Sequence, residues 1–138
     1  MSDRLDLAAV LTAVSCSRAF TKLTLNRWGA SSVVDDALIV VSELVTNAIE
    51  ATGVTMPHPA WSELDELQCV TVRLVGLDTS IVIEVWDVDP HLPTESQAEL
   101  DAESGRGLWL VGKLTTKWGS YPVARGKVVW GEIAVSGG

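Results

Sequence analysis

Hydrophobic residues recur at helical spacing in two segments of the N-terminal half of the chain. Residues 12–28 form the first segment, and Gly29 follows it, in a position where glycine commonly ends a helix. The second segment reaches about Ala51, and Ser31 or Ser32 is a suitable N-cap for it. Its core stripe follows the i, i+3, i+4, i+7 spacing and comprises Val34, Ala37, Leu38, Val41, Val45 and Ala48. The pattern therefore predicts two helices that each bury one face.

Hydrophobic and polar residues alternate with a period of two in the C-terminal half, which is typical of strands. Residues 69–76 and 80–87 predict a first hairpin, and residues 120–123 and 127–135 predict a second one. A helix with a glycine-rich start is expected between them, over residues 105–118. This order of helices, strands, helix and strands predicts an α+β two-layer sandwich, with helices on one face of a mainly antiparallel sheet.

The length and composition indicate one globular domain over residues 1–138. Of the 138 residues, 47% are hydrophobic and 20% are charged, which is typical of a folded protein. Two segments that contain prolines, residues 52–67 and 88–103, are predicted to be loops. No apolar run approaches the roughly 20 residues that a membrane helix needs, and the N-terminus lacks the features of a signal peptide. We therefore expect a cytoplasmic protein with no membrane contact.

The net charge and the two cysteines argue against some classes of function. A net charge of −8 argues against a nucleic-acid binder, which needs a basic face, and suits basic protein partners. The two cysteines, Cys16 and Cys69, stand far apart in apolar contexts and lack metal-ligand spacing. We expect both to be reduced and buried.

Two polar residues interrupt the apolar run VSELVTNAIEAT in the second predicted helix. Glu43 and Asn47 are four residues apart, so they are neighbours on one stripe beside the core stripe. A carboxylate there can act as a general base, and an amide oxygen is a hard ligand that suits Mg²⁺. The spacing alone favours the simpler alternative, a polar flank in which the two side chains bond to each other.

Two further sites combine with this stripe. Asp87 ends the predicted buried face of its strand, where it either accepts a hydrogen bond from the amine of a base or caps a turn. A predicted helix begins with Gly105, Arg106 and Gly107. This helix start either binds phosphate or is an ordinary entry from loop to helix. Together, the three sites predict a nucleotide-binding site.

Four stretches of the chain carry a family resemblance, which covers nearly its whole length. VVSELVTNAIEA resembles the asparagine box of the Bergerat-fold (GHKL) ATPase superfamily, and EVWDVDPHLP resembles a shortened first glycine box. ESGRGLWLVGKLTTKWG resembles the second glycine box, and GKVVWGEI resembles the closing strand. Within the superfamily, the chain looks most like small proteins related to bacterial anti-sigma factor serine kinases.

The resemblance implies ATP and Mg²⁺ as cofactors and a role for each candidate residue. Glu43 would be the general base, and Asn47 would bind the Mg²⁺ that bridges the phosphates. Asp87 would accept a hydrogen bond from the adenine amine. Gly105 and Gly107 would let the chain wrap the phosphates, which Arg106 would also contact.

Several positions depart from the family's pattern. No glycine follows Asp87, and Asp89 would repel phosphate if it pointed inward. Val128 looks like the position where relatives usually have a threonine near the adenine. Glu50 and Ala51 stand where a basic residue and a histidine often follow the asparagine. These departures predict weaker binding of adenine and phosphate than is usual in the family.

The resemblance implies a serine/threonine protein kinase that also acts as an anti-sigma factor. Its expected partners are a sigma factor and a STAS-domain anti-anti-sigma protein, and the family analogy suggests homodimers. An alternative is a catalytically inactive regulator that works by protein–protein binding only. In that case an exposed tryptophan would mark the interface, and Trp86 is the best candidate because it is out of phase with the buried strand face. A plain ATPase ranks third.

Overall fold

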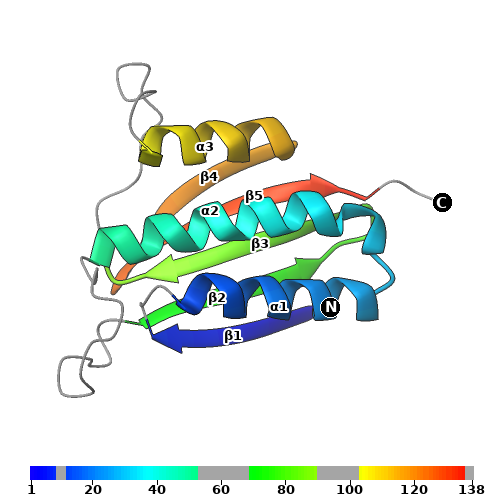
Figure 1. Cartoon of the computed structure of the whole chain (residues 1–138), viewed down its shortest axis with the longest axis horizontal. Coiled ribbons are helices and arrows are strands. Elements are labelled where there is room, and N and C mark those ends of the chain that lie inside the picture. Colours follow the sequence, from blue (N-terminus) through cyan, green and yellow to red (C-terminus); the bar gives the residue numbers. More distant parts are fainter. Residues whose placement is uncertain (9–11, 53–68, 90–102, 136–138) are drawn as a thin grey trace.

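The computed structural model describes residues 1–8, 12–52, 69–89 and 103–135, together with the side chains of these residues except those of 52 and 103–106 (Figure 1). The predicted loop 52–67 therefore lies outside the described residues apart from Thr52, as does most of loop 88–103. The elements, in chain order, are β1 (Ser2–Ala8), α1 (Thr12–Arg27), the 3-10 turn η1 (Ser31–Val33), α2 (Val34–Thr52), β2 (Cys69–Gly76), β3 (Ser80–Asp87), α3 (Glu103–Leu114), β4 (Lys117–Val123) and β5 (Gly126–Ala134).

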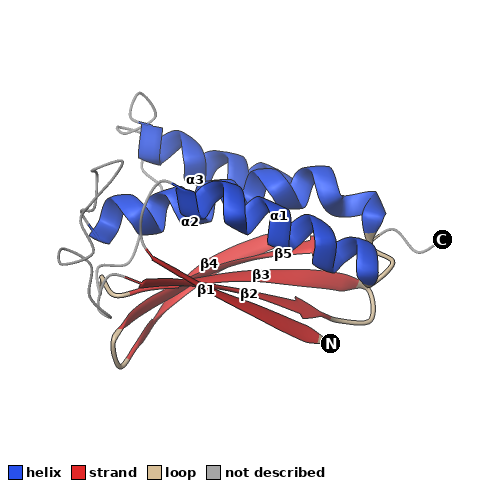
Figure 2. Ribbon diagram, turned by 60° about the horizontal axis from the view of Figure 1, so that its bottom comes forward, coloured by secondary structure: helices blue, strands red, loops and turns tan. Residues whose placement is uncertain are grey.

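The five strands form one antiparallel sheet in the order β1-β2-β3-β5-β4. All three α-helices lie on the same face of this sheet, so the molecule has two layers (Figure 2). The predicted α+β two-layer sandwich is confirmed. None of the described helices is long and apolar enough to cross a membrane.

The core lies between the sheet and the helix layer. Alternate residues of β2 and β3 point towards the helices and are at most 2% exposed, namely Val70, Val72, Leu74, Ile81, Ile83 and Val85. They meet the buried side of α2, which is wider than the predicted stripe because Val40 and Leu44 are also buried. A broad apolar side holds α2 firmly across the centre of the sheet.

Gly131 of β5 lets the helices approach the sheet closely. A Cβ atom added at Gly131 would lie 2.9 Å from Cγ2 of Thr115 and within 3.7 Å of Val40 and Val111. These neighbours belong to α2, to α3 and to the residue after α3, so the missing side chain determines how near both helices come to β5.

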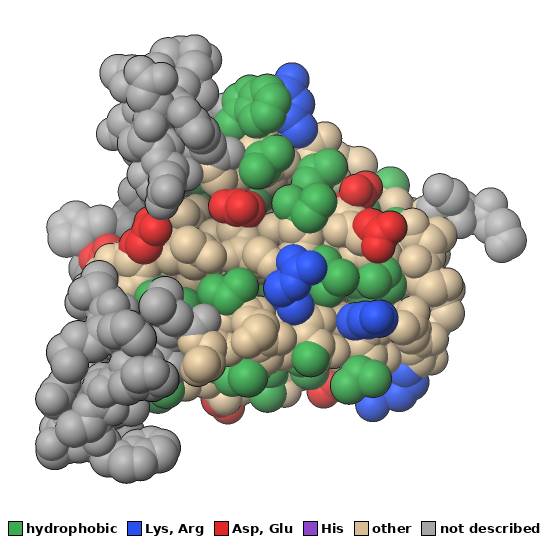
Figure 3. Space-filling model, in the orientation of Figure 1, with side chains coloured by type: hydrophobic (Ala, Val, Ile, Leu, Met, Phe, Trp, Pro, Cys, Tyr) green, Lys and Arg blue, Asp and Glu red, His purple; other side chains and the backbone are tan. Residues whose placement is uncertain are grey.

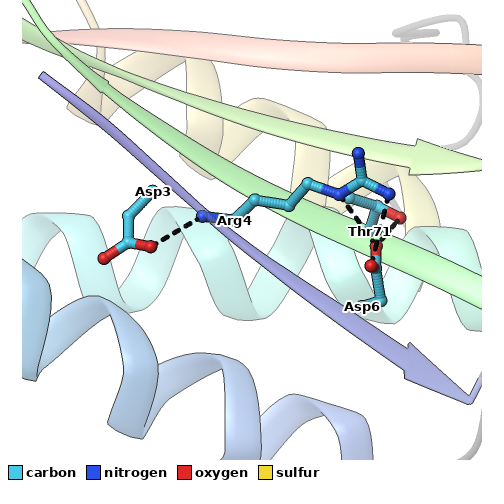
Figure 4. A network of polar contacts seen from close by, with 4 residues as sticks. All are labelled: Asp3, Arg4, Asp6 and Thr71. Carbon is cyan, nitrogen blue, oxygen red and sulfur yellow. Dashed lines mark hydrogen bonds and ion pairs between the residues drawn. The ribbon is translucent and has the colours of Figure 1, made fainter.

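The strand β1 was not predicted. It pairs with β2 along its whole length, from Ser2 opposite Val75 to Ala8 opposite Cys69. Figure 4 shows that Arg4 holds the carboxylate of Asp6 with two bonds of 3.1 and 3.2 Å, and that Thr71 of β2 donates to the same carboxylate at 2.6 Å. These bonds, first that from Thr71 and then those from Arg4, lower the pKa of Asp6. The bond from Thr71 also links β2 to the edge strand, whereas Arg4 lies on β1 itself.

The helix boundaries differ from the sequence pattern at the start of the second helix and at both ends of α3. Gly29 has a φ of 74° directly after α1, as expected for a glycine that ends a helix. Ser31 lies in the turn η1, where no side chain caps the helix, so the predicted serine cap is wrong. Trp118 belongs to β4, because α3 ends at Leu114 and not at residue 118. The expectation that both cysteines are buried is also wrong, since Cys16 is exposed and Cys69 is half-buried.

Candidate functional site

Three elements that carry the candidate residues end or begin on the same side of the molecule. In Figure 1, α2 and β3 both end at the left, and α3 begins there. The sheet topology explains this, since α2 crosses the sheet over β3 and α3 packs beside α2. The fold thus places Asn47, Asp87 and the start of α3 towards one end of the domain.

Gly107 of α3 lies against the polar stripe of α2. A Cβ atom added at Gly107 would be 2.6 Å from Oε2 of Glu43 and 3.7 Å from Oδ1 of Asn47. No side chain larger than hydrogen leaves room for the Glu43 carboxylate in its present position. The structure therefore brings the pair Glu43 and Asn47 next to the glycine-rich start of α3, although the two sites are about 60 residues apart in the chain.

Glu43 is half-buried, and its pKa is raised above the ordinary value. Burial is the largest cause, and the negative charge of Glu50 further along the same helix adds to it. A carboxylate with a raised pKa holds a proton more tightly and is a stronger base when ionised. The setting of Glu43 is therefore that of a candidate general base.

Asp87 is the most deeply buried carboxylate among the described residues, at 1% exposure. Its Oδ1 accepts a hydrogen bond of 2.9 Å from Lys127 Nζ and another of 2.8 Å from the backbone N–H of Asp89. Burial raises the pKa of Asp87, whereas the hydrogen bond and the charge of Lys127 act in the opposite direction. The bond to Asp89 also gives Asp87 the turn-capping role that the sequence left open.

Lys127 is the site residue that the sequence analysis missed. It lies opposite Asp87 in the pairing of β3 with β5, and it is 4% exposed. The alternation of β5 was the available signal, because Lys127, Val129 and Ile133 share the face that is buried beneath the helices. Lysine is rarely buried without a partner, so this position could have been paired with the buried acid at the end of β3.

Val128 does not lie on the helix side of the sheet. It is half-buried on the opposite face, where it pairs with Trp86, so our assignment of Val128 to an adenine-contacting position is wrong. The reason is the period of two in a strand, which turns neighbouring residues to opposite faces. The expectation for Asp89 was that its charge would repel phosphate if it pointed inward. Its carboxylate instead lies 3.6 Å from the Lys127 ammonium, which offsets the negative charge of Asp89.

The helix α3 begins earlier than predicted. Its first residue is Glu103, so Gly105 lies in its first turn and Gly107 follows after that turn. The backbone N–H groups without a partner inside the helix belong to its first four residues, which include Gly105 and Arg106. The side chain of Arg106 lies outside the described residues, and its expected contact with phosphate stays a prediction.

A sequence model of one protein family, described as the histidine kinase-like ATPase domain, matches residues 7–131. The chain belongs to this family. All of the candidate residues named above fall within the matched range, and the two-layer fold agrees with that of a GHKL-type ATPase. A comparison with curated proteins found no match.

Membership in the histidine kinase-like ATPase family implies an ATP-binding domain, usually with Mg²⁺, and the residues present fit that pair. Asn47 offers an amide oxygen beside the Glu43 carboxylate, on the side of α2 that α3 faces. Within the described ranges, no group of three or more His, Cys, Asp or Glu side chains could hold a metal by itself. Mg²⁺ commonly binds through one or two protein ligands and the phosphate oxygens of its nucleotide, and this donor set suits that mode.

The helix layer of this ATPase domain also exposes a tryptophan. Trp109 of α3 is 44% exposed, and Lys113 lies over its ring with 5.4 Å between Nζ and the ring centroid. Figure 3 shows hydrophobic side chains over the region of α3, next to a basic side chain. Trp86, the tryptophan that the strand pattern singled out, is half-buried on the open face of the sheet.

Proposed function

We propose that this histidine kinase-like ATPase domain binds Mg²⁺-ATP beside α2 and α3 and transfers a phosphoryl group to a serine or threonine of a protein. The acceptor is a STAS-domain anti-anti-sigma protein, and a sigma factor is the second partner, as in anti-sigma factor kinases. The observation that carries the proposal is the contact of Gly107 with Glu43, since it places a candidate base beside the glycine-rich start of α3.

Each residue of the site has a separate task in this reaction. ATP supplies the phosphoryl group, and Mg²⁺ offsets the charge of the phosphates. Asn47 holds the metal, and Asp87 accepts a hydrogen bond from the amine of the adenine. Glu43 takes the proton from the acceptor hydroxyl as its oxygen bonds to the γ-phosphorus, while the bond from that phosphorus to ADP breaks.

The raised pKa of Glu43 supports its role as the base. A carboxylate at its ordinary pKa is a weak base at neutral pH, and partial burial strengthens it. The close packing of Gly107 against the Glu43 carboxylate also limits where that carboxylate can point. This favours a defined position of the carboxylate relative to the acceptor hydroxyl.

The test is transfer of labelled phosphate from ATP to a purified STAS-domain partner. We expect Glu43→Gln to lower the rate of transfer by about 10²- to 10⁴-fold, the usual range for loss of a general base. Asp36→Asn is the matched control, because it removes one negative charge from the exposed first turn of the same helix. Its rate should equal that of the wild type.

Three results would each overturn a different part of the proposal. Transfer that survives in Glu43→Gln would remove Glu43 from the role of base. Binding of ATP without transfer to any serine or threonine would leave a nucleotide-binding regulator. Absence of ATP binding at millimolar concentration would overturn the proposed use of the site altogether.

The second candidate function is a regulator that acts only by binding a protein, and the exposure of Trp109 favours it. Tryptophan is enriched at the centres of protein interfaces. In this case, Trp109→Ala would abolish capture of the partner, while Glu43→Gln and Asn47→Ala would leave capture unchanged. A kinase would instead lose phosphorylation of its partner in Glu43→Gln and in Asn47→Ala.

A further inference from the structure

Lys127 is a charged residue on an otherwise apolar strand face. It is 4% exposed, and it shares that face of β5 with Val129, Gly131 and Ile133. A buried ammonium destabilises the fold unless paired and hydrogen-bonded. Its burial therefore requires partners, and the arrangement of those partners indicates what the lysine does.

The partners of Lys127 all belong to the end of β3 and the residues after it. Its Nζ donates to Asp87 Oδ1 at 2.9 Å and to the backbone carbonyl of Asp89 at 3.1 Å. The Asp89 carboxylate lies 3.6 Å away. An ammonium has three donors. Two of them bond to the Asp87 carboxylate and to the Asp89 carbonyl, and the Asp89 carboxylate adds an ion pair, so the contacts within the described residues direct Lys127 towards this segment.

The backbone holds Lys127 in this place. Asp87 and Lys127 lie opposite each other in the β3–β5 register, and Gly126 precedes the lysine with a φ of 124°. A Cβ atom at Gly126 would overlap the carbonyl oxygen of Asp87. The start of β5 therefore packs directly on the Asp87 backbone, next to the point where Lys127 bonds to Asp87 and Asp89.

From these contacts, and resting on the proposed function, we infer that Lys127 is a positioning residue that makes Asp87 selective for a base with an exocyclic amine. It does so by holding the Asp87 carboxylate ionised and in one orientation. An ionised carboxylate only accepts hydrogen bonds, as an amine requires, whereas a protonated one also donates. A donor would suit a base that has a keto oxygen in place of the amine.

The electrostatics of the site agree with this geometry. The pKa of Asp87 is raised overall, with burial as the largest cause, and the bond and charge of Lys127 are the largest influences that limit this rise. Among the described residues, the other group that affects Asp87 is Asp89, whose N–H lowers the pKa and whose charge raises it. Removal of Lys127 thus leaves a buried carboxylate that protonates at higher pH.

The test compares binding of ATP with that of inosine triphosphate, in which a keto oxygen replaces the amine. The two affinities would be measured by calorimetry between about pH 5.5 and 8.5 on wild type, Lys127→Met and Lys127→Arg. The affinity ratio is the readout, because titration of the phosphates affects both nucleotides alike. We expect the wild type to prefer ATP by about 10-fold or more at every pH.

The variants should separate positioning from a merely structural role. In Lys127→Met, the preference for ATP should fall as the pH falls, because Asp87 becomes protonated, and Lys127→Arg should restore it. If Lys127→Met keeps the wild-type ratio at every pH, the inference about Lys127 is wrong while nucleotide binding stands. If the wild type binds neither nucleotide, the proposed function fails and this inference fails with it.

A second measurement covers the case in which Lys127→Met does not fold. The carbon chemical shift of the Asp87 carboxyl group in the wild-type protein, assigned with Asp87→Asn, reports its ionisation directly. We expect no titration between about pH 5.5 and 8.5. A midpoint inside that range would show that Lys127 does not hold Asp87 ionised, and would overturn the inference.

Discussion

Gly107 of α3 lies against the Glu43 carboxylate of α2. A Cβ atom added at Gly107 would lie 2.6 Å from Oε2 of Glu43, which is too short for any unstrained contact. Glycine at position 107 therefore serves the packing of α3 against Glu43.

Gly107→Ala should reduce phosphoryl transfer while leaving the fold intact. The clash involves the far end of a flexible side chain, so Glu43 can move aside, and alanine is the better helix former by about 1 kcal/mol. Displacement of a catalytic group by about 1 Å lowers a rate by up to roughly 10²-fold. Single-turnover transfer and thermal unfolding measure the two effects.

Gly112→Ala is the matched control for this substitution. Gly112 lies on the same helix, and the nearest atom to its added Cβ is Trp118 Nε1 at 3.4 Å, an ordinary contact. Its transfer rate should stay at the wild-type level. Equal loss of activity in the two variants would contradict a specific effect on Glu43.

Glu43→Gln should stabilise the fold at neutral pH, as well as impair activity. The pKa of Glu43 is raised in the folded state, so the folded protein binds this proton more tightly than the unfolded chain does. Ionisation therefore destabilises the fold as the pH rises from about 4.3, the unfolded value, through the folded pKa. The gain in stability from Glu43→Gln should be present at pH values above this range and absent at pH values below it. Urea unfolding at pH 7 and at pH 4 would measure the difference, and an equal gain at both would disprove the linkage.

Glu50→Gln should move the acid limb of the activity profile to lower pH. The charge of Glu50 is the second cause of the raised pKa of Glu43, after burial. Its removal lowers that pKa, so Glu43 ionises, and becomes active as a base, at lower pH. Because Glu50 is exposed, the shift should be small and should shrink in high salt. A shift to higher pH would contradict this explanation.

Thr21→Val should stabilise the protein by about 1 kcal/mol. The Thr21 hydroxyl of α1 is fully buried and has no hydrogen-bond partner among the residues that the structure describes. Valine has the same shape without the polar atom, so the substitution removes an unpaired group without leaving a cavity. Ser17→Ala on the same helix is the comparison, since the Ser17 hydroxyl donates to the Ala13 carbonyl at 2.6 Å, and its loss should not stabilise the fold. Chemical denaturation would rank the two variants.

Gly126→Ala should destabilise the protein by about 2–4 kcal/mol. Its φ of 124° is strained for any other residue, and the added Cβ would meet the backbone of Asp87 and Val88, which cannot move aside easily. Gly29→Ala is the comparison at positive φ, because no atom lies within 4 Å of its added Cβ. It should cost only about 1 kcal/mol. Similar losses in the two variants would mean that the contact with Asp87 is unimportant.

The predicted elements followed from local patterns, and most of them are confirmed. The ranges 69–76 and 80–87 agree with β2 and β3, because alternation in a half-buried strand is directly visible in the sequence. The edge strand β1 escaped notice because its burial is only partial, although Leu5 and Leu7 do alternate with polar residues. An edge strand becomes recognisable only when its partner is known, and β2 lies more than 60 residues away.

By itself, the sequence determined the helices, the two hairpins, the polar stripe of Glu43 and Asn47, and the family. Each of these depends on residue type and near spacing along the chain. Only the tertiary structure decided that Gly107 touches Glu43 and that Lys127 pairs with Asp87. These contacts join residues 40 or more positions apart, and they depend on how the helices pack on the sheet and on the β3–β5 register. Spacing along one chain carries no information on such distances, because packing and strand pairing set them.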